Sequence, residues 1–181
     1  MTMTDFSHNY DTSKAYDEMF DSTGKVRESY KEIFSVFKSM GMNEFDSRGL
    51  IRDKSFIDQG ITFSYSGEER PWPLDLIPRI ITNTEWTTIE QGLFQRVKAL
   101  EMFLEDIYND QNILEDGILP RSVVVSSKHF HREVHGLSPT NNVRIHVAGI
   151  DLIRDINGEF RILEDNLRCP SGISYVLENR S

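Results

Sequence analysis

Two β-like runs near the end of the chain decide the fold: Val143-Arg-Ile-His-Val-Ala-Gly-Ile-Asp-Leu-Ile-Arg154 and Glu159-Phe-Arg-Ile-Leu-Glu164. Between them lies Asp155-Ile-Asn-Gly158, and an Asn-Gly pair favours the type I′ turn of a two-residue hairpin loop. Such a loop pairs Asp151 with Glu164 across the hairpin. The sequence therefore predicts a β-hairpin in which two carboxylates face each other.

These opposed carboxylates suggest a metal site. Directly opposed like charges destabilise a hairpin unless something neutralises them. Asn166 follows Glu164 by two residues, so its side chain lies on the same face of an extended strand. Two carboxylates and an amide oxygen are hard ligands, and we expect Asp151, Glu164 and Asn166 to hold Mg²⁺ or Mn²⁺. Ordinary solvated sheet residues fit the same spacing equally well, and a bulge or a three-residue loop would break the register.

Length and composition describe an acidic globular protein. The 181 residues amount to about one domain, and 29 Asp and Glu against 20 Lys and Arg give a net charge of -9, which disfavours a nucleic-acid partner. The single cysteine, Cys169, excludes a disulfide framework or a thiolate zinc site built from this chain alone. Neither a membrane span nor a secretory leader is visible, so we expect no membrane partner and a cytoplasmic location.

The rest of the chain combines helix and strand patterns, which predicts an α+β fold. Its clearest feature is a long amphipathic helix that Thr82-x-x-Glu85 opens as a capping box, packed on a mainly antiparallel sheet. Residues 1–24 form a polar N-terminal arm, either loose or docked. Pro120 can open a helix, although Val123-Val-Val125 favours a strand. The expected elements are helices over 25–40, 43–59 and 84–109, strands over 61–65 and 117–127, a loop over 67–73 and the 142–164 hairpin.

The hairpin resembles the metal-binding hairpin of the ATP-grasp superfamily, in which an aspartate precedes a Glu-x-Asn motif by the same interval. Several segments resemble, more specifically, the circularly permuted ATP-grasp type 2 family. They are Pro73-Leu-Asp-Leu-Ile-Pro-Arg-Ile-Ile81, Gln95-Arg-Val-Lys-Ala-Leu100, His146-Val-Ala-Gly-Ile-Asp151, and Leu163-Glu-Asp-Asn-Leu-Arg168 with Pro170-Ser-Gly172 and Ser174-Tyr-Val-Leu-Glu-Asn-Arg180. The resemblance implies that residues 25–181 are the N-terminal portion of such a domain, with residues 142–168 as its metal-binding hairpin.

The resemblance implies an ATP- and magnesium-dependent carboxylate–amine ligase, which forms an amide through an acylphosphate. In the superfamily, the residues that match Asp151, Glu164 and Asn166 hold magnesium on ATP. Arg168 is then a catalytic and nucleotide-binding clamp on the transferring phosphoryl group, because a guanidinium recognises phosphate oxygens with paired hydrogen bonds. Backbone or hydroxyl donors for the bound molecules are expected from Ser171 and Gly172.

One position departs from the superfamily pattern. Members such as D-alanine–D-alanine ligase carry an arginine two residues before the metal aspartate, where this chain has Gly149. A cation that binds the developing oxyanion therefore has to come from elsewhere. Arg144, His146 or a residue outside this chain would supply it.

The family also bears on partners and on activity. Its metal-binding part precedes its nucleotide-cradling part, and these 181 residues carry no Gly-rich loop suited to a triphosphate. We expect an N-terminal part that is inactive alone and works with the remaining half of the domain, on small-molecule or peptide carboxylate and amine substrates. A non-catalytic binding or assembly module is the alternative. A metal-dependent nuclease is a weaker one, because Asn166 stands where such nucleases carry lysine.

Overall fold

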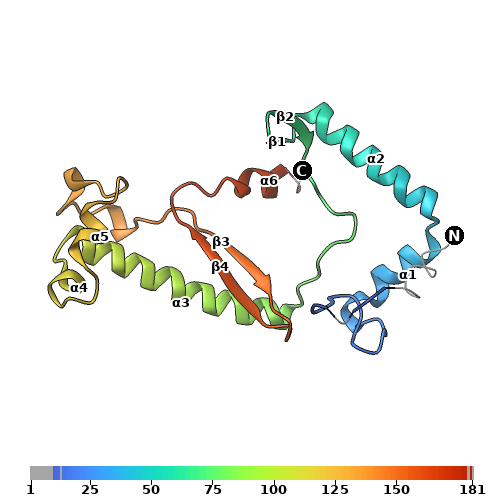
Figure 1. The fold of residues 1–181 in the computed structure, drawn as a ribbon, viewed down its shortest axis with the longest axis horizontal. Helices are drawn as coiled ribbons and strands as arrows, with labels where there is room; N and C mark the ends of the chain where they lie inside the picture. Colours follow the sequence, from blue (N-terminus) through green and yellow to red (C-terminus); the bar gives the residue numbers. More distant parts are fainter. Residues whose placement is uncertain (1–9, 13, 179, 181) are drawn as a thin grey trace. The chain divides into compact units, whose positions relative to one another are not determined.

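A computed structural model describes residues 10–12, 14–178 and 180, and this part of the chain has a mixed α+β fold with six α-helices and two two-stranded antiparallel sheets (Figure 1). The chain forms two compact units. The first unit contains the described residues up to Glu85, together with Leu152–Arg161 and the described residues from Ser171 on. The second unit contains Trp86–Asp151 and Ile162–Pro170. The α+β prediction is confirmed.

The first unit contains α1 (Lys31–Ser39), α2 (Met42–Gln59) and α6 (Gly172–Glu178). α2 ends at Gly60, whose φ of 71° is the left-handed conformation that glycine adopts without steric cost. The helices predicted over 25–40 and 43–59 are therefore present, although the first begins only at a short 3₁₀ turn, η2 (Glu28–Tyr30).

A small hairpin follows α2 and contacts α6. β1 (Thr62–Tyr65) pairs with β2 (Glu68–Pro71), so the expected loop over 67–73 is wrong in part. Ser66 and Gly67 both have positive φ, 53° and 84°, as the two-residue turn of a twisted hairpin requires. Tyr175 of α6 stacks on Trp72 at 3.7 Å between ring centroids and donates its hydroxyl to the Thr62 carbonyl at 3.0 Å.

In the second unit, three helices build a small apolar core. α3 (Asn83–Tyr108), α4 (Asn112–Glu115) and α5 (Arg121–Val125) contribute the buried Ile107, Leu114 and Val124. The strand predicted over 117–127 is wrong, since α5 occupies it. Pro120 precedes the first helical residue and its carbonyl accepts the Val123 N–H at 3.0 Å, so helix packing overrides the β-propensity of the valines.

The predicted capping box is present where α3 begins. The Glu85 carboxylate accepts the N–H and the hydroxyl of Thr82, both at 2.8 Å, and the Thr82 hydroxyl accepts the Glu85 N–H at 3.3 Å. The same carboxylate accepts from the Arg154 guanidinium at 2.8 Å. The start of the long helix is thereby tied to the hairpin within the first unit.

That hairpin consists of β3 (Gly149–Arg154) and β4 (Phe160–Asn166), seen as paired arrows in Figure 1. The first strand is shorter than predicted. In the segment before it, the N–H groups of Arg144 and Ile145 donate to the Glu101 carboxylate of α3, at 3.0 and 2.6 Å for the shorter contacts. A side chain takes the hydrogen bonds that a longer strand would have made.

The turn of the hairpin also differs from the prediction. The Asp155 N–H donates to the Glu159 carbonyl and the Gly158 N–H donates to the Asp155 carbonyl, both at 2.9 Å. These bonds close a loop of three residues, Ile156 to Gly158, and Gly158 has a φ of 84°. The predicted two-residue loop is therefore wrong. Three-residue hairpin loops commonly consist of a type I turn followed by a left-handed residue, and Gly158 occupies that last position.

Described residues of the N-terminal arm belong to the first unit and contact other residues of that unit. Glu18 accepts from Arg79 at 2.8 Å and lies 3.4 Å from the buried Arg154 guanidinium. Phe20 forms an isolated antiparallel bridge with Val26. No helix in the described part of the chain is long and apolar enough to cross a membrane.

The Glu85 contacts predict a pH-dependent stability. Burial alone would raise the pKa of Glu85, but the hydrogen bonds from Thr82 and Arg154 together lower that pKa below its ordinary value. A lowered pKa in the folded state stabilises the fold above the unfolded-state pKa, and this stabilisation is lost as the pH falls through the folded-state pKa. The difference in unfolding free energy between wild type and Glu85→Gln should therefore shrink as the pH falls from about 7 to about 3.

Chemical denaturation followed by circular dichroism measures this difference. Glu90→Gln, an exposed change on the same helix, is the control and should show a small difference that does not vary with pH. A difference for Glu85→Gln that is independent of pH would contradict the assignment.

Candidate functional site

The three predicted metal ligands lie in the second unit. Asp151 lies on β3, and Glu164 and Asn166 lie on β4. Both carboxylates are exposed, and the amide is half-buried. The Asn166 Nδ2 donates to Glu164 Oε1 at 2.8 Å, so these two side chains lie together as their spacing predicts.

The three-residue turn changes the pairing near these ligands. Counted from the turn, Leu163 rather than Glu164 lies opposite Asp151. At the other end of the hairpin, however, a Cβ on Gly149 would lie 3.6 Å from the Asn166 Cβ. This proximity indicates that Gly149 lies opposite Asn166, as the two-residue loop predicts. The alternation of exposure along β4 breaks between these ends, where Leu163 and Glu164 are both exposed. One extra residue in β4 at this point accounts for all three observations, because a β-bulge sets two residues against one.

The donor set suits a hard divalent cation. In the part of the chain that the structure describes, the Asp151 carboxylate has no hydrogen-bond or ion-pair partner, and Glu164 has only Asn166. Because Asn166 donates through its nitrogen, its amide oxygen stays available as an acceptor. Two carboxylate groups and one amide oxygen fit the oxygen preference of Mg²⁺ and leave positions for water or phosphate.

Clusters of the more familiar metal ligands are absent from the described residues. No three His, Cys, Asp or Glu side chains among them form a group that could hold an ion. The segment with His129, His131, Glu133 and His135 is exposed, and His131 Nδ1 lies 3.3 Å from a Glu133 carboxylate oxygen. The predicted set differs from such clusters because its third ligand is an amide.

Asp165 lies between the two β4 ligands and points elsewhere. Its carboxylate accepts two hydrogen bonds from Arg96 of α3, from Nε at 2.7 Å and from Nη2 at 2.6 Å. The hydrogen bond from the Arg96 guanidinium lowers the pKa of Asp165. Asp165 is thus committed to the helix, whereas its neighbours Glu164 and Asn166 contact each other.

Gly149 has a steric role that explains why no arginine stands there. A Cβ at this position would lie 2.5 Å from the Pro170 Cβ, a distance that side chains essentially never show. The nearest arginine upstream, Arg144, has both terminal guanidinium nitrogens buried without a hydrogen-bond partner in the described structure. A buried guanidinium without a partner is costly to the folded state.

The remaining predicted residues lie further along the chain. Arg168 belongs to the second unit, is exposed, and has no hydrogen-bond or ion-pair partner within the described residues. Ser171 and Gly172 belong to the first unit, where the Ser171 carbonyl accepts from Ser174 at 2.9 Å and Gly172 begins α6. Cys169 is a free, exposed thiol.

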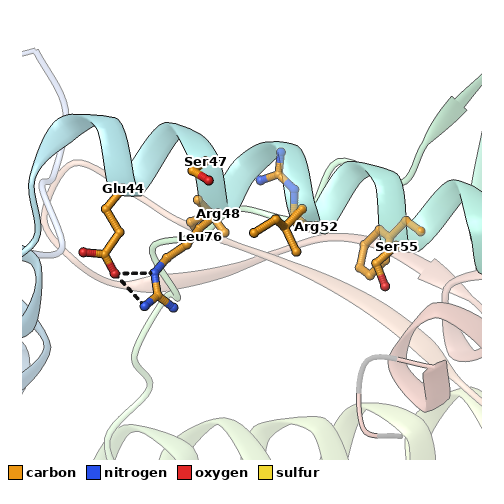
Figure 2. Close-up of a pocket in the computed structure, with 8 residues that line it drawn as sticks. Glu44, Ser47, Arg48, Arg52, Ser55 and Leu76 are labelled. Carbon is orange, nitrogen blue, oxygen red and sulfur yellow. Dashed lines mark hydrogen bonds and ion pairs between the residues drawn. The ribbon is translucent and has the colours of Figure 1, made fainter.

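Two grooves of the first unit contain none of these residues. One of about 680 Å³ lies along α2. There the Arg48 guanidinium donates to the Glu44 carboxylate at 2.7 Å, and Figure 2 draws this pair with Arg52 and Leu76. The other, of about 1110 Å³, has seven aromatic side chains among its lining residues, including Tyr30. Neither groove is lined by a predicted metal ligand.

Arg96 and Glu101 are two residues whose importance the sequence analysis missed. Both lie on α3: Arg96 contacts the strand that carries Glu164 and Asn166, and Glu101 contacts the segment that leads into β3. Arg96 lies in the Gln95–Leu100 segment of the family resemblance, which was a signal for it. Glu101 follows that segment directly and has no signal of its own.

Substitution of Gly149 tests the close approach to Pro170. Gly149→Ala should lower the free energy of unfolding by about 1–3 kcal/mol, because the added methyl group meets a rigid proline ring. Gly92→Ala on α3 is the matched control: nothing lies within 4 Å of its added Cβ, and alanine favours a helix. Thermal unfolding compares the two, and a Gly149→Ala variant as stable as Gly92→Ala would refute the steric role.

Comparison with known proteins places the chain in a family. Residues 78–181, more than half of the chain, match the circularly permuted ATP-grasp type 2 family. An uncharacterised protein of Mycobacterium leprae is 59% identical over 168 residues, which are 93% of this chain and 30% of that protein. An uncharacterised protein of Mycobacterium tuberculosis strain H37Rv is 58% identical over 175 residues, 94% of this chain and 32% of that protein.

A third relative carries a functional name. A Frankia casuarinae protein with the provisional name glutamate–cysteine ligase 2-2 is 43% identical over 167 residues, which are 91% of this chain and 19% of that protein. The chain thus spans about a third or less of the length of these curated relatives. From the extent of the family match, the chain belongs to the circularly permuted ATP-grasp type 2 family.

Proposed function

We propose that this chain is the metal-binding part of an ATP-dependent carboxylate–amine ligase. Membership of the ATP-grasp family and the ligase name of the Frankia relative support a ligase-type activity. The observation that carries the proposal is the donor set of the hairpin. Glu164 and Asn166 lie together on β4, Asp151 lies exposed on β3, and neither carboxylate has a cationic partner in the described structure.

The proposed reaction has two steps. A carboxylate oxygen of the substrate attacks the γ-phosphorus of ATP, and the bond to ADP breaks to give an acylphosphate. An amine nitrogen then attacks the acyl carbon, phosphate leaves with the electrons of its C–O bond, and the nitrogen loses a proton to give the amide. Bound Mg²⁺ would neutralise phosphate charge in both steps.

The residues of this chain divide the work on this proposal. Asp151, Glu164 and Asn166 would hold the cation, and Glu164 is the ligand most suited to serve two ions. The Arg168 guanidinium is exposed and has no hydrogen-bond or ion-pair partner among the described residues, and it is our choice for the clamp on the transferring phosphoryl group. The terminal nitrogens of Arg144 are buried without a partner in the described part of the chain, and Arg144 is our choice for the cation that the superfamily pattern would place at Gly149.

Binding of Mn²⁺ to the 181-residue chain tests the ligand set. Electron paramagnetic resonance counts free Mn²⁺ in a titration, and the chain should bind one ion. Glu164→Gln and Asp151→Asn should each weaken the affinity at least about tenfold, because each removes a charged ligand. Glu159→Gln removes an exposed carboxylate from the same hairpin and should leave the affinity unchanged. Equal effects of Glu159→Gln and Glu164→Gln would contradict the assignment.

The isolated chain should not turn over ATP. The relatives from Mycobacterium are about three times as long as the match, so we place the rest of the nucleotide site in that additional length. The rate at which the wild-type chain releases phosphate from ATP in the presence of Mg²⁺, measured with a coupled assay, should equal the rate of the Glu164→Ala variant. Turnover by the wild-type chain that Glu164→Ala abolishes would show that the site is complete within these residues.

A further inference from the structure

We propose that Arg96 and Glu101 of α3 are positioning residues for the metal site. This inference rests on the proposed function, because it concerns the ligands Asp151, Glu164 and Asn166. The two side chains act on the two ligand-bearing segments separately. Arg96 holds β4, and Glu101 holds the segment that leads into β3.

The Arg96 contact fixes β4 between its two ligands. Both hydrogen bonds to Asp165 are short, at 2.7 and 2.6 Å, and they use two adjacent nitrogens of a planar guanidinium. Such a bidentate pair restrains the direction of the carboxylate as well as its distance. Because Asp165 alternates with Glu164 and Asn166 along the strand, its restraint sets the direction in which both neighbours point.

This pair is better suited to orientation than to stability. The Arg96 side chain is 41% exposed, and exposed ion pairs contribute little to the free energy of folding. Loss of the pair should therefore leave the chain folded, while the strand segment that carries Glu164 and Asn166 gains freedom. A ligand set that must be ordered by the ion itself binds that ion more weakly.

The Glu101 contact fixes the approach to β3. Its carboxylate accepts the N–H of Arg144 at 3.0 Å and that of Ile145 at 2.6 Å, and the Ile145 side chain is buried. Ile145 lies six residues before Asp151, so this anchor ends close to the first ligand strand. Arg96 and Glu101 are five residues apart on α3, about 7.5 Å along its axis. One rigid helix thus restrains both segments.

The sign of the charge effect makes Arg96 the sharper test. Arg96→Gln removes a positive charge from the surroundings of a cation site. Because this change lowers the Coulomb repulsion of Mn²⁺, the charge effect alone would tighten Mn²⁺ binding. The positioning role predicts the opposite. We expect Arg96→Gln to weaken Mn²⁺ binding to the 181-residue chain about five- to tenfold, and Arg96→Lys to restore part of the loss.

Mn²⁺ titration by electron paramagnetic resonance measures these affinities, and thermal unfolding checks that each variant is folded. Lys98→Gln is the matched control, because it removes an exposed positive charge two residues along the same helix and should leave binding unchanged. Glu101→Gln should also weaken binding. Absence of Mn²⁺ binding by the wild-type chain would overturn the proposed function itself. Wild-type binding that Arg96→Gln leaves equal or tighter would overturn only the positioning role.

Discussion

The bidentate ion pair between Arg96 and Asp165 is the constraint on which the proposed metal site depends. It joins the long helix α3 to the strand that carries two of the three predicted ligands, at 2.7 and 2.6 Å. Strand alternation then separates the roles of three consecutive residues. Asp165 faces the helix, whereas Glu164 and Asn166 contact each other and keep their remaining oxygens available.

The hairpin register is locally irregular near the predicted ligands. The three-residue turn shifts the pairing by one residue relative to a two-residue loop, and this shift alone would move Glu164 away from Asp151. The consecutive exposure of Leu163 and Glu164 and the proximity of Gly149 to Asn166 are the marks of a compensating bulge. Bulges of this kind are common beside active sites, because they redirect a side chain without breaking the sheet.

Local chemistry explains which parts of the fold the sequence predicts. The Thr82–Glu85 capping box, the Gly60 helix end and the hairpin strands follow from residues close in sequence, and all are present. The errors arise where tertiary packing decides. Val123–Val125 is helical, and Val124 packs in the core with α3 and α4. β3 begins late because the Glu101 carboxylate accepts the backbone N–H groups that precede it.

The candidate site was predicted for a reason that is only partly geometric. Residue types and spacing indicate Asp151, Glu164 and Asn166 as candidate ligands. The family resemblance favours a metal site over the alternative that these are ordinary solvated sheet residues. The turn on which the pairing argument relied is absent. The partners that orient the ligands, Arg96 and Glu101, lie more than 40 residues away in sequence and required the structure.

The central claim is that the hairpin of this chain holds a divalent cation through two carboxylates and one amide. Anomalous diffraction from crystals of the chain grown with Mn²⁺ tests it most directly. We expect a manganese peak within about 2–2.5 Å of oxygens from Asp151, Glu164 and Asn166. Manganese peaks at other carboxylates, with none beside Glu164, would contradict it.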